Sequence, residues 1–591
     1  MKFKNISTLV VGAFMAVTAF TSCNDYLTVY PKDLTLGYDY WKKGSDVQEV
    51  AAGAYKQMIN ANIEERAIVW GTYRSDEVNL AQSNTNTDFL NIASVNLLPS
   101  QNMCDWAGFY NVINRCNVVL NHAPHVLDID PDFTTGDYEV VRGNMLALRS
   151  LCYFYLVRAF RDVPYSSHSY EDDNQPDMKL PQSAPDSVLQ LCINDCKEAE
   201  GLVMKSGAYG LNDWHNWGYF TKDAVDALLA DIYLWRASMT HSAEDYQQCV
   251  EYCDKIITSK DAYYKKYLTD RLIVDDPNDT LHLYKRDEML EEIIINGNSR
   301  EGILELQYDG QANSNGTLCN YLYRTGDASS NSTFMASQIF NQIDPNANTI
   351  DGNKIFSTLK DQRYWNFLFD VNNDQLTEQN IRKFGNATGL NVTIGNSDSH
   401  GQTLTQGGTR RTGNFDQNWI IYRLTDIMLM KAEALVQLSQ QDDDEYLHHA
   451  FALVQAVNQR SMAMNAAYDD TLHVTDYPTK DQMELLVLNE RERELCFEGK
   501  RWFDLVRYCY RHMDGVDIHT KMADQTKWPA LYSQFVSMIT RKYVTGGDVF
   551  QLKMKTEPFL YWPVNKNDTK INPLLKDNPV FVDLKSSEKN Y

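Results

Sequence analysis

The fold is predicted most directly from residues 221–259, TKDAVDALLADIYLWRASMTHSAEDYQQCVEYCDKIITS. In its first half Val225, Leu228 and Ile232 recur at helical spacing, which puts them on one face of a helix. A short polar turn then leads into a second segment of the same kind. The stretch therefore predicts two consecutive helices of about the length of one tetratricopeptide unit.

Similar helical patterns lie on both sides of this stretch. Upstream, helices are expected near residues 103–122, 140–163 and 186–204, and they can stack as further pairs. Downstream, a second helical block contains WIIYRLTDIMLMKAEALVQL, YLHHAFALVQAVNQRSM and MELLVLNERERELCFEGKRWFDLVRY. The Trp-Leu-Gly signature of tetratricopeptide repeats is mostly missing, so the repeat prediction depends on segment length and on alternating small and aromatic residues.

The segment between the two helical blocks has a different composition. Helical periodicity fades, and Asn, Gly, Ser, Thr and Asp accumulate, as in DASSNSTF and TIGNSDSHGQTLTQGGTRRTGNFDQN. Within it, EGILELQYDG alternates apolar and polar residues from Ile303 to Tyr308, which predicts a strand.

These patterns predict a mainly α protein with a tetratricopeptide-like helical scaffold, a long irregular loop-rich excursion and minor β structure. No linker of Pro/Ser or charge-run type divides the chain, so we expect a single domain over residues 23–591. Its expected parts are the helix pairs of 23–261, the excursion of 262–417 and the helical part of 418–591.

The N-terminus has the layout of a bacterial export signal over residues 1–22. Lys2 and Lys4 precede an apolar stretch that is shorter than the roughly 20 apolar residues needed to span a bilayer. The small residues before Cys23 resemble the lipobox of bacterial lipoproteins, in which the cysteine becomes the acylated first residue. The sequence therefore predicts an exported protein with a lipid anchor at Cys23.

The charge balance narrows the class of ligand. The chain carries 79 acidic against 55 basic side chains and a formal net charge of −24. This balance argues against nucleic acid as a partner, because its phosphates require Lys and Arg for neutralisation. An acidic protein suits an uncharged ligand better than an anionic one. Most of the 35 tyrosines are expected in the core, and a minority at the surface.

The cysteines do not have the spacing of a disulfide framework or of a zinc site. Cys192 with Cys196, and Cys249 with Cys253, stand four apart in helical patterns, where each pair shares one face as small buried hydrophobes. We expect the others to be mostly reduced core thiols as well: Cys104, Cys116, Cys152, Cys319, Cys496 and Cys509.

Motifs for catalysis or cofactor binding are missing from the sequence. There is no phosphate loop, nucleophile elbow or HExxH, and no cofactor or metal is expected. His122 and His125 lack a third ligand nearby, so a polar helix terminus is favoured over a metal site. Glu494 and Glu498 lie in a helix of alternating charges, which favours salt bridges over acid catalysis. GGTRRTG leaves anion binding open as a weaker alternative.

Four segments together resemble the SusD/RagB family of surface glycan-binding lipoproteins. They are CNDYLTVYPKD, LALRSLCYFYLVRAFRDVPY, the pair IIYRLTDIMLMKAEAL and NERERELCFEGKRWFDLVRY, and FLYWPVNKNDTKINPLLKDNP. They follow the family order over nearly the whole mature chain. Two departures occur near the C-terminus, where Trp562, Pro563 and Val564 replace the usual Ile-Pro, and Val580 and Phe581 replace a closing Gly-Tyr.

The resemblance implies a ligand site made by two polar segments, WGTYRSDEVNLAQSNTNTDF and YDGQANSNGTLCNYLYRTG. Alternation in Tyr321, Leu322 and Tyr323 would turn both tyrosines the same way if this part is extended. The tryptophans of starch-binding members are replaced here by Asn79, Leu80 and Gln82, so the starch-type aromatic arc is absent. The candidate ligand-binding residues are Trp70, Tyr73, Asn79, Gln82, Asn84, Phe89, Tyr308, Tyr321, Tyr323 and Arg324.

The resemblance also implies a function and partners. The chain would be lipid-anchored in the outer membrane, face the cell surface, bind oligosaccharide or polysaccharide, and deliver it to a SusC-like TonB-dependent transporter. It would not be an enzyme. Two alternatives remain open: the same fold with peptides or another nutrient as cargo, and a surface glycosidase. The glycosidase would need a pair of carboxylates, which the sequence does not indicate.

Overall fold

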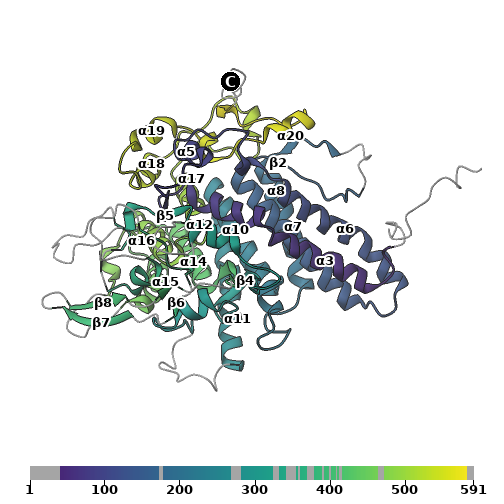
Figure 1. Cartoon of the computed structure of the whole chain (residues 1–591), viewed down its shortest axis with the longest axis horizontal. Coiled ribbons are helices and arrows are strands. Elements are labelled where there is room, and N and C mark those ends of the chain that lie inside the picture. Colours follow the sequence, from purple (N-terminus) through teal and green to yellow (C-terminus); the bar gives the residue numbers. More distant parts are fainter. Residues whose placement is uncertain are drawn as a thin grey trace, which may run out of the picture.

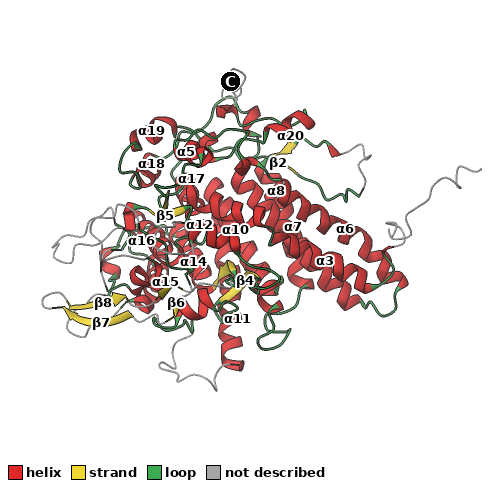
Figure 2. Cartoon of the chain, in the orientation of Figure 1, coloured by secondary structure: helices red, strands yellow, loops and turns green. Residues whose placement is uncertain are grey.

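The computed structural model describes residues 40–581, with gaps at 172–177, 268–280, 324–331, 341–353, 357, 359, 369–378, 386, 389–391, 398–400, 407–408, 411–414 and 463–470 (Figure 1). Helices dominate the described part, and the strands are short and few (Figure 2). The mainly α fold class predicted from the sequence is therefore confirmed. The expected signal segment and Cys23 lie outside the described residues.

The N-terminal part is a set of long helices packed side by side (Figure 1). They are α3 (Gly44–Met58), α6 (Ala107–Ile129), α7 (Thr135–Phe160) and α8 (Pro185–Leu202). A capping box fixes the start of α7, because the Thr134 hydroxyl accepts from the Asp137 amide and the Asp137 carboxylate accepts from the Thr134 amide. Every residue of α7 from Gly143 to Phe160 is buried, so α7 is the central helix of this part.

The helix pair predicted over residues 221–259 is present. It consists of α10 (Lys222–Thr240) and α11 (Ala243–Tyr267). His241 adopts a left-handed conformation with φ 59°, which ends α10 and turns the chain into α11. Because α10 packs against α8, α11, α14 and α17, it is buried over most of its circumference.

The C-terminal helical part continues the stack next to α11. It contains α14 (Leu424–Leu438), α15 (Glu445–Ser461), α16 (Lys480–Leu495) and α17 (Arg501–Arg511). Helix α14 contacts α10, α11, α15 and α16, so it joins the two helical parts into one core.

One expected helix begins later than its sequence suggests. Trp419–Arg423 forms strand β10, which pairs antiparallel with β4 (Gly302–Leu306), and α14 starts only after it. All ten residues of the two strands are buried. The expectation of a helix from Trp419 is therefore wrong, because β-branched and aromatic residues there find a buried partner strand. The strand predicted from Ile303 is confirmed.

The remaining elements are short. The other helices are α4 (Ala61–Ile68), α5 (Thr87–Ala93), α9 (His215–Gly218), α12 (Gly316–Leu322), α13 (Gln362–Phe367), α18 (Ser533–Thr540), α19 (Gly547–Lys553) and α20 (Lys566–Ile571). Strand pairs are β1 (Val78–Leu80) with β5 (Phe334–Ala336), β2 (Val163–Pro164) with β3 (Gln182–Ser183), β6 (Ala387–Thr388) with β9 (Thr409–Arg410), and β7 (Val392–Ser397) with β8 (Gly401–Gln406). Part of GGTRRTG lies outside the described residues.

A buried ion network holds α16 in the core. The Glu494 carboxylate contacts the guanidinium groups of Arg363 at 3.1 Å, Arg423 at 2.6 Å and Arg460. Burial alone would raise the pKa of Glu494, but the three positive charges outweigh it and hold this pKa well below its ordinary value. The structural interpretation of this charged helix is confirmed.

A second contact joins residues that are far apart in the sequence. The Gly71 backbone lies so close to Gly499 that a Cβ atom at residue 71 would be 1.9 Å from the Gly499 carbonyl oxygen. Nearby, the buried Asp76 carboxylate accepts from Arg501 Nε at 2.8 Å and Nη2 at 3.0 Å, across 425 residues. Burial would raise the pKa of Asp76, but Arg501 outweighs it, so the pKa lies below its ordinary value.

The cysteines and the histidine pair have structural surroundings. All ten cysteines of the described part are free and buried, which confirms the prediction of core thiols. His122 stacks on Trp41 with ring centroids 4.6 Å apart, and its Nε2 lies 2.8 Å from a Glu171 carboxylate oxygen. His125 is exposed.

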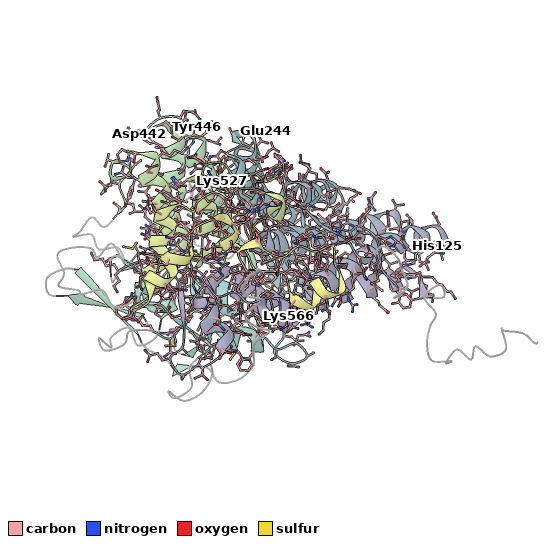
Figure 3. The ribbon with its side chains drawn as sticks, turned by 90° about the horizontal axis from the view of Figure 1, so that it is seen from above. His125, Glu244, Asp442, Tyr446, Lys527 and Lys566 are labelled. Atoms are coloured by element: carbon pink, nitrogen blue, oxygen red, sulfur yellow. The ribbon has the colours of Figure 1, made fainter. Side chains whose placement is uncertain are left out.

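Seen from above, the molecule is elongated. His125 of α6 lies at the opposite end from Asp442 and Tyr446, which flank the start of α15 (Figure 3). Among the helices of the described part, none combines the length and apolar character that crossing a bilayer requires.

Candidate functional site

A polar cleft lies where the two predicted segments meet. Pairing of β1 with β5 is extended by Ala81, whose amide donates to the Thr333 carbonyl at 3.0 Å. The Thr333 amide in turn donates to the Asn320 carbonyl of α12 at 2.9 Å. The loop that follows β1 and the helix α12 are thereby held next to each other, although their residues are far apart in the sequence.

This polar cleft has a volume of about 670 Å³. Helix α4 contributes one wall, the loop after β1 and the start of β5 contribute others, and α12 completes it. Its lining residues are Asn62, Glu65, Ser83, Asn84, Thr85, Thr317, Asn320, Tyr321, Ser332 and Thr333. Hydroxyl and carboxamide groups therefore surround one aromatic ring.

Tyr321 is that ring. It is half-buried at the edge of an aromatic cluster, with its centroid 6.1 Å from that of Phe89 and 5.4 Å from that of Phe334. Its hydroxyl donates to the Glu65 carboxylate of α4. Burial, followed by the hydrogen bond to Glu65, raises the pKa of Tyr321, so the ring is neutral and fixed in orientation.

Asparagine side chains cap the elements that carry these groups. The Asn315 side chain accepts from the Leu318 amide at 3.0 Å and fixes the start of α12. In the loop after β1, the Asn84 side-chain oxygen accepts from the Asn86 amide at 2.9 Å, and Asn86 caps α5. The Asn84 carboxamide nitrogen is not part of these bonds. Asn84 and Tyr321 are thus the two sequence-predicted residues that line the cleft.

Three other predicted rings belong to the core. Trp70 is fully buried, donates from Nε1 to the Met103 carbonyl at 3.0 Å, and stacks on Phe109. Tyr73 and Phe89 are also buried, and the Tyr73 hydroxyl donates to the Phe89 carbonyl at 2.8 Å. The expectation that these rings stack on a ligand is wrong, because packing leaves them no exposed face.

The segment before Tyr323 is helical, and only Tyr323 itself has extended backbone. Tyr321 and Leu322 end α12, so the alternation rule does not apply, and Tyr323 is buried next to Gly385. A ligand-stacking role for Tyr323 is therefore wrong as well. Arg324 lies outside the described residues.

The remaining predicted residues lie near the cleft without lining it. Asn79 is half-buried in β1 and donates from its side chain to the Lys542 carbonyl at 3.2 Å. Gln82 is exposed in the following loop. Tyr308 lines a neighbouring pocket, and its hydroxyl donates to Glu64 at 2.7 Å.

Sequence reasoning missed much of the cleft wall. Asn62 and Glu65 come from α4, and Thr317 and Asn320 come from α12. Polar residues on one face of a helix usually indicate a solvated face, so no pattern marked them. Pairing of β1 with β5, which brings Ser332 and Thr333 to the cleft, joins strands of only three residues each and leaves no periodic signal.

Two family models together match most of the chain. A family model described as "Starch-binding associating with outer membrane" matches residues 32–234, and a second, described as "SusD family", matches residues 300–581. The two matches include both walls of the cleft. The chain belongs to the SusD/RagB family. Proteins of this family are glycan-binding proteins rather than enzymes.

SusD-like relatives and solved SusD structures resemble most of the chain. SusD-like protein P38 of Formosa agariphila is 26% identical over 530 residues, which cover 86% of this chain and 92% of the relative. A SusD homolog from Bacteroides thetaiotaomicron superposes with a TM-score of 0.62 at 15% identity, covering 91% of this chain and 97% of its own. A SusD superfamily protein from Bacteroides vulgatus gives 0.61 at 17% identity, covering 91% and 99%. At these identities the structural matches establish the fold alone.

Proposed function

We propose that this SusD/RagB protein binds a neutral oligosaccharide in the polar cleft at the cell surface and delivers it to a SusC-like TonB-dependent transporter. The observation that carries the proposal is the cleft itself, where hydroxyl and carboxamide groups from α4, α12, the loop after β1 and the residues before β5 surround the Tyr321 ring. Ligand sites typically combine an apolar face with a few placed polar groups, and a sugar presents an apolar ring face bordered by hydroxyls.

The donors and acceptors of the cleft suit hydroxyl groups. Carboxamides such as Asn62 and Asn320 offer both donors and acceptors, and Thr317 adds a hydroxyl. No Lys or Arg occurs among the described lining residues, so an anionic ligand would find no counter-charge there.

Binding without cleavage is the expected chemistry. Glu65 is the one carboxylate among the described residues that line the cleft, and it is engaged by the Tyr321 hydroxyl. Glycoside hydrolysis ordinarily requires two carboxyl groups on opposite sides of the scissile bond. Incubation of the protein with the bound glycan should therefore release no new reducing ends.

Replacing Tyr321 by Ala is expected to weaken glycan binding by about 1 to 3 kcal/mol, the range of an interface hot spot. Tyr321→Phe should retain most of the affinity, because it keeps the ring and removes only the hydroxyl. A glycan array first identifies the ligand, and isothermal titration with that glycan then measures each variant.

Tyr446→Ala is the control for this prediction, because it removes the same side chain from the surface at a position outside the cleft. Equal affinities of Tyr321→Ala and Tyr446→Ala would contradict the assignment of the cleft. If the protein binds members of a peptide library and no glycan of the array, the alternative of a peptide cargo is favoured.

Replacing Cys23 by Ala is expected to leave the protein folded but release it from the outer membrane. Acyl chains contribute about 0.8 kcal/mol of membrane affinity per buried CH₂, and the change removes them. Fractionation after a salt wash, with melting temperature as the folding control, measures this. Retention of the variant in the membrane fraction would show that another anchor exists.

A further inference from the structure

A second pocket lies on the other side of the turn between α3 and α4. Ile59, just after α3, lines this pocket, whereas Asn62 in the first turn of α4 lines the polar cleft. The pocket has a volume of about 600 Å³ and shares none of its lining residues with the cleft. We call it the aromatic pocket, and its rings are Tyr55, Trp214, Tyr219 and Tyr308.

Trp214 is exposed although it is held in a fixed position. It is 44% exposed, stacks on His215 with ring centroids 3.9 Å apart, and meets the edge of Tyr219 at 5.5 Å. Gly218 makes this arrangement possible, because a Cβ atom there would lie 2.7 Å from the Trp214 ring and from Gln307 Cγ. An indole that packing fixes at a pocket wall is costly to leave in water and is pre-oriented for a flat partner.

A buried carboxylate, that of Glu305, belongs to the wall of the aromatic pocket. Glu305 is completely buried, and its Oε2 accepts from the Asn298 amide at 2.9 Å and from Asn418 Nδ2 at 2.8 Å. Its Oε1 is enclosed by the protein, since a Cβ atom at Gly302 would lie only 2.4 Å from it. The carboxylate therefore orders the wall of the pocket through Asn298 and Asn418.

The charged groups at the rim are already engaged. The Lys56 ammonium donates to the Asn313 side chain, and the Asp309 carboxylate accepts from the Gln311 and Asn313 amides at 2.9 and 2.8 Å. The pocket therefore offers ring faces and carboxamides, with one positive and one negative side chain, Lys56 and Asp309, at its rim.

We propose that the aromatic pocket is a second saccharide site, in which a sugar ring stacks on Trp214 and its hydroxyls meet the carboxamide side chains that line the pocket, such as that of Gln307. The ligand class, a neutral saccharide, depends on the proposed function, whereas the location depends only on Trp214 and the pocket beside it. Because the two sites flank one short turn, a long glycan can occupy both, and the second site then raises the affinity for long chains over short ones.

The test follows Trp214 directly. The full-length protein is labelled with 5-fluorotryptophan, and the Trp214 fluorine resonance is assigned by its loss in Trp214→Phe. Maltotetraose, cellotetraose, xylotetraose, mannotetraose and an uncharged tyrosine-containing tetrapeptide are then titrated separately. At least one saccharide should shift the Trp214 resonance, and Tyr321→Ala should leave that shift in place.

Titration calorimetry supplies the second measurement. Trp214→Ala is expected to weaken binding of the responding saccharide at this site roughly fivefold or more, the lower end of hot-spot effects. Leu552→Ala, which removes another exposed apolar side chain, is the control. Because Trp214 is exposed, melting temperatures of both variants should match that of the wild type.

Each outcome separates the two proposals. A Trp214 resonance that no saccharide shifts, or that only the peptide shifts, overturns the second site. So does a shift that disappears in Tyr321→Ala, because it would then be transmitted from the polar cleft. If calorimetry finds that the total saccharide binding of the protein is lost in Trp214→Ala and unchanged in Tyr321→Ala, the second site is supported and the proposed function of the cleft is contradicted.

Discussion

Trp502→Ala is expected to lower the free energy of unfolding by about 3 to 5 kcal/mol, the usual cost of truncating a buried Trp or Phe. Trp502 lies in α17 and is 1% exposed. Its ring packs against Phe535 and below the Arg74 guanidinium, whose carbon is 4.3 Å from the ring centroid. The substitution removes a large apolar side chain from the core. It also removes the ring over which the buried Arg74 guanidinium lies.

Urea denaturation measures this effect, with Trp214→Ala as the matched control. The control removes the same side chain from an exposed site, and a change below about 1 kcal/mol is expected there, as for most surface substitutions. An unchanged midpoint for Trp502→Ala combined with loss of glycan binding would assign Trp502 to ligand binding instead of the core.

Glu494→Gln should have a comparable cost, about 3 to 5 kcal/mol at neutral pH, because it removes the negative partner of a buried ion network. Arg363, Arg423 and Arg460 would then share a buried site without the charge that compensates them. Because the change keeps the shape of the side chain, the decrease in the free energy of unfolding reports the contribution of its negative charge. Glu445→Gln is the control, since that carboxylate is 86% exposed.

The same network predicts a pH dependence. The pKa of Glu494 is depressed in the folded state, so its contribution is fully present above the ordinary value of 4.5 and is lost as the pH falls below it. Acidification should therefore destabilise the wild type more than Glu494→Gln. Urea curves at neutral pH and below pH 4.5 test this, and equal losses for both proteins would contradict it.

Periodic patterns made much of the fold predictable. The helix pair from residue 221 onward follows from spacing alone, and the four-residue spacing of Cys192 with Cys196 and of Cys249 with Cys253 placed each pair on one helix face. Trp419–Arg423 shows the limit, because a short apolar run fits a buried strand or a helix equally well. The partner β4, more than a hundred residues upstream, decides between them.

The candidate site was harder to predict, because exposure is a property of the assembled core. Trp70 lies in a polar, Asn-rich neighbourhood, but it fills the space between Phe109 and Phe160. Trp214 had no distinguishing signal in the sequence, although it is the more accessible tryptophan. Local composition does not show which ring remains at the surface after packing.

The close approach of Gly71 to Gly499 has a consequence for the order of folding. Asp76 remains a buried acid without its counter-ion until Arg501 is present, so no shorter N-terminal portion can complete this part of the core. Bringing residues this far apart together costs chain entropy before the stabilising contacts form, and this slows folding. The nascent chain must therefore be kept from aggregating until nearly all of it has been synthesised, and assistance by chaperones should matter more than local helix formation.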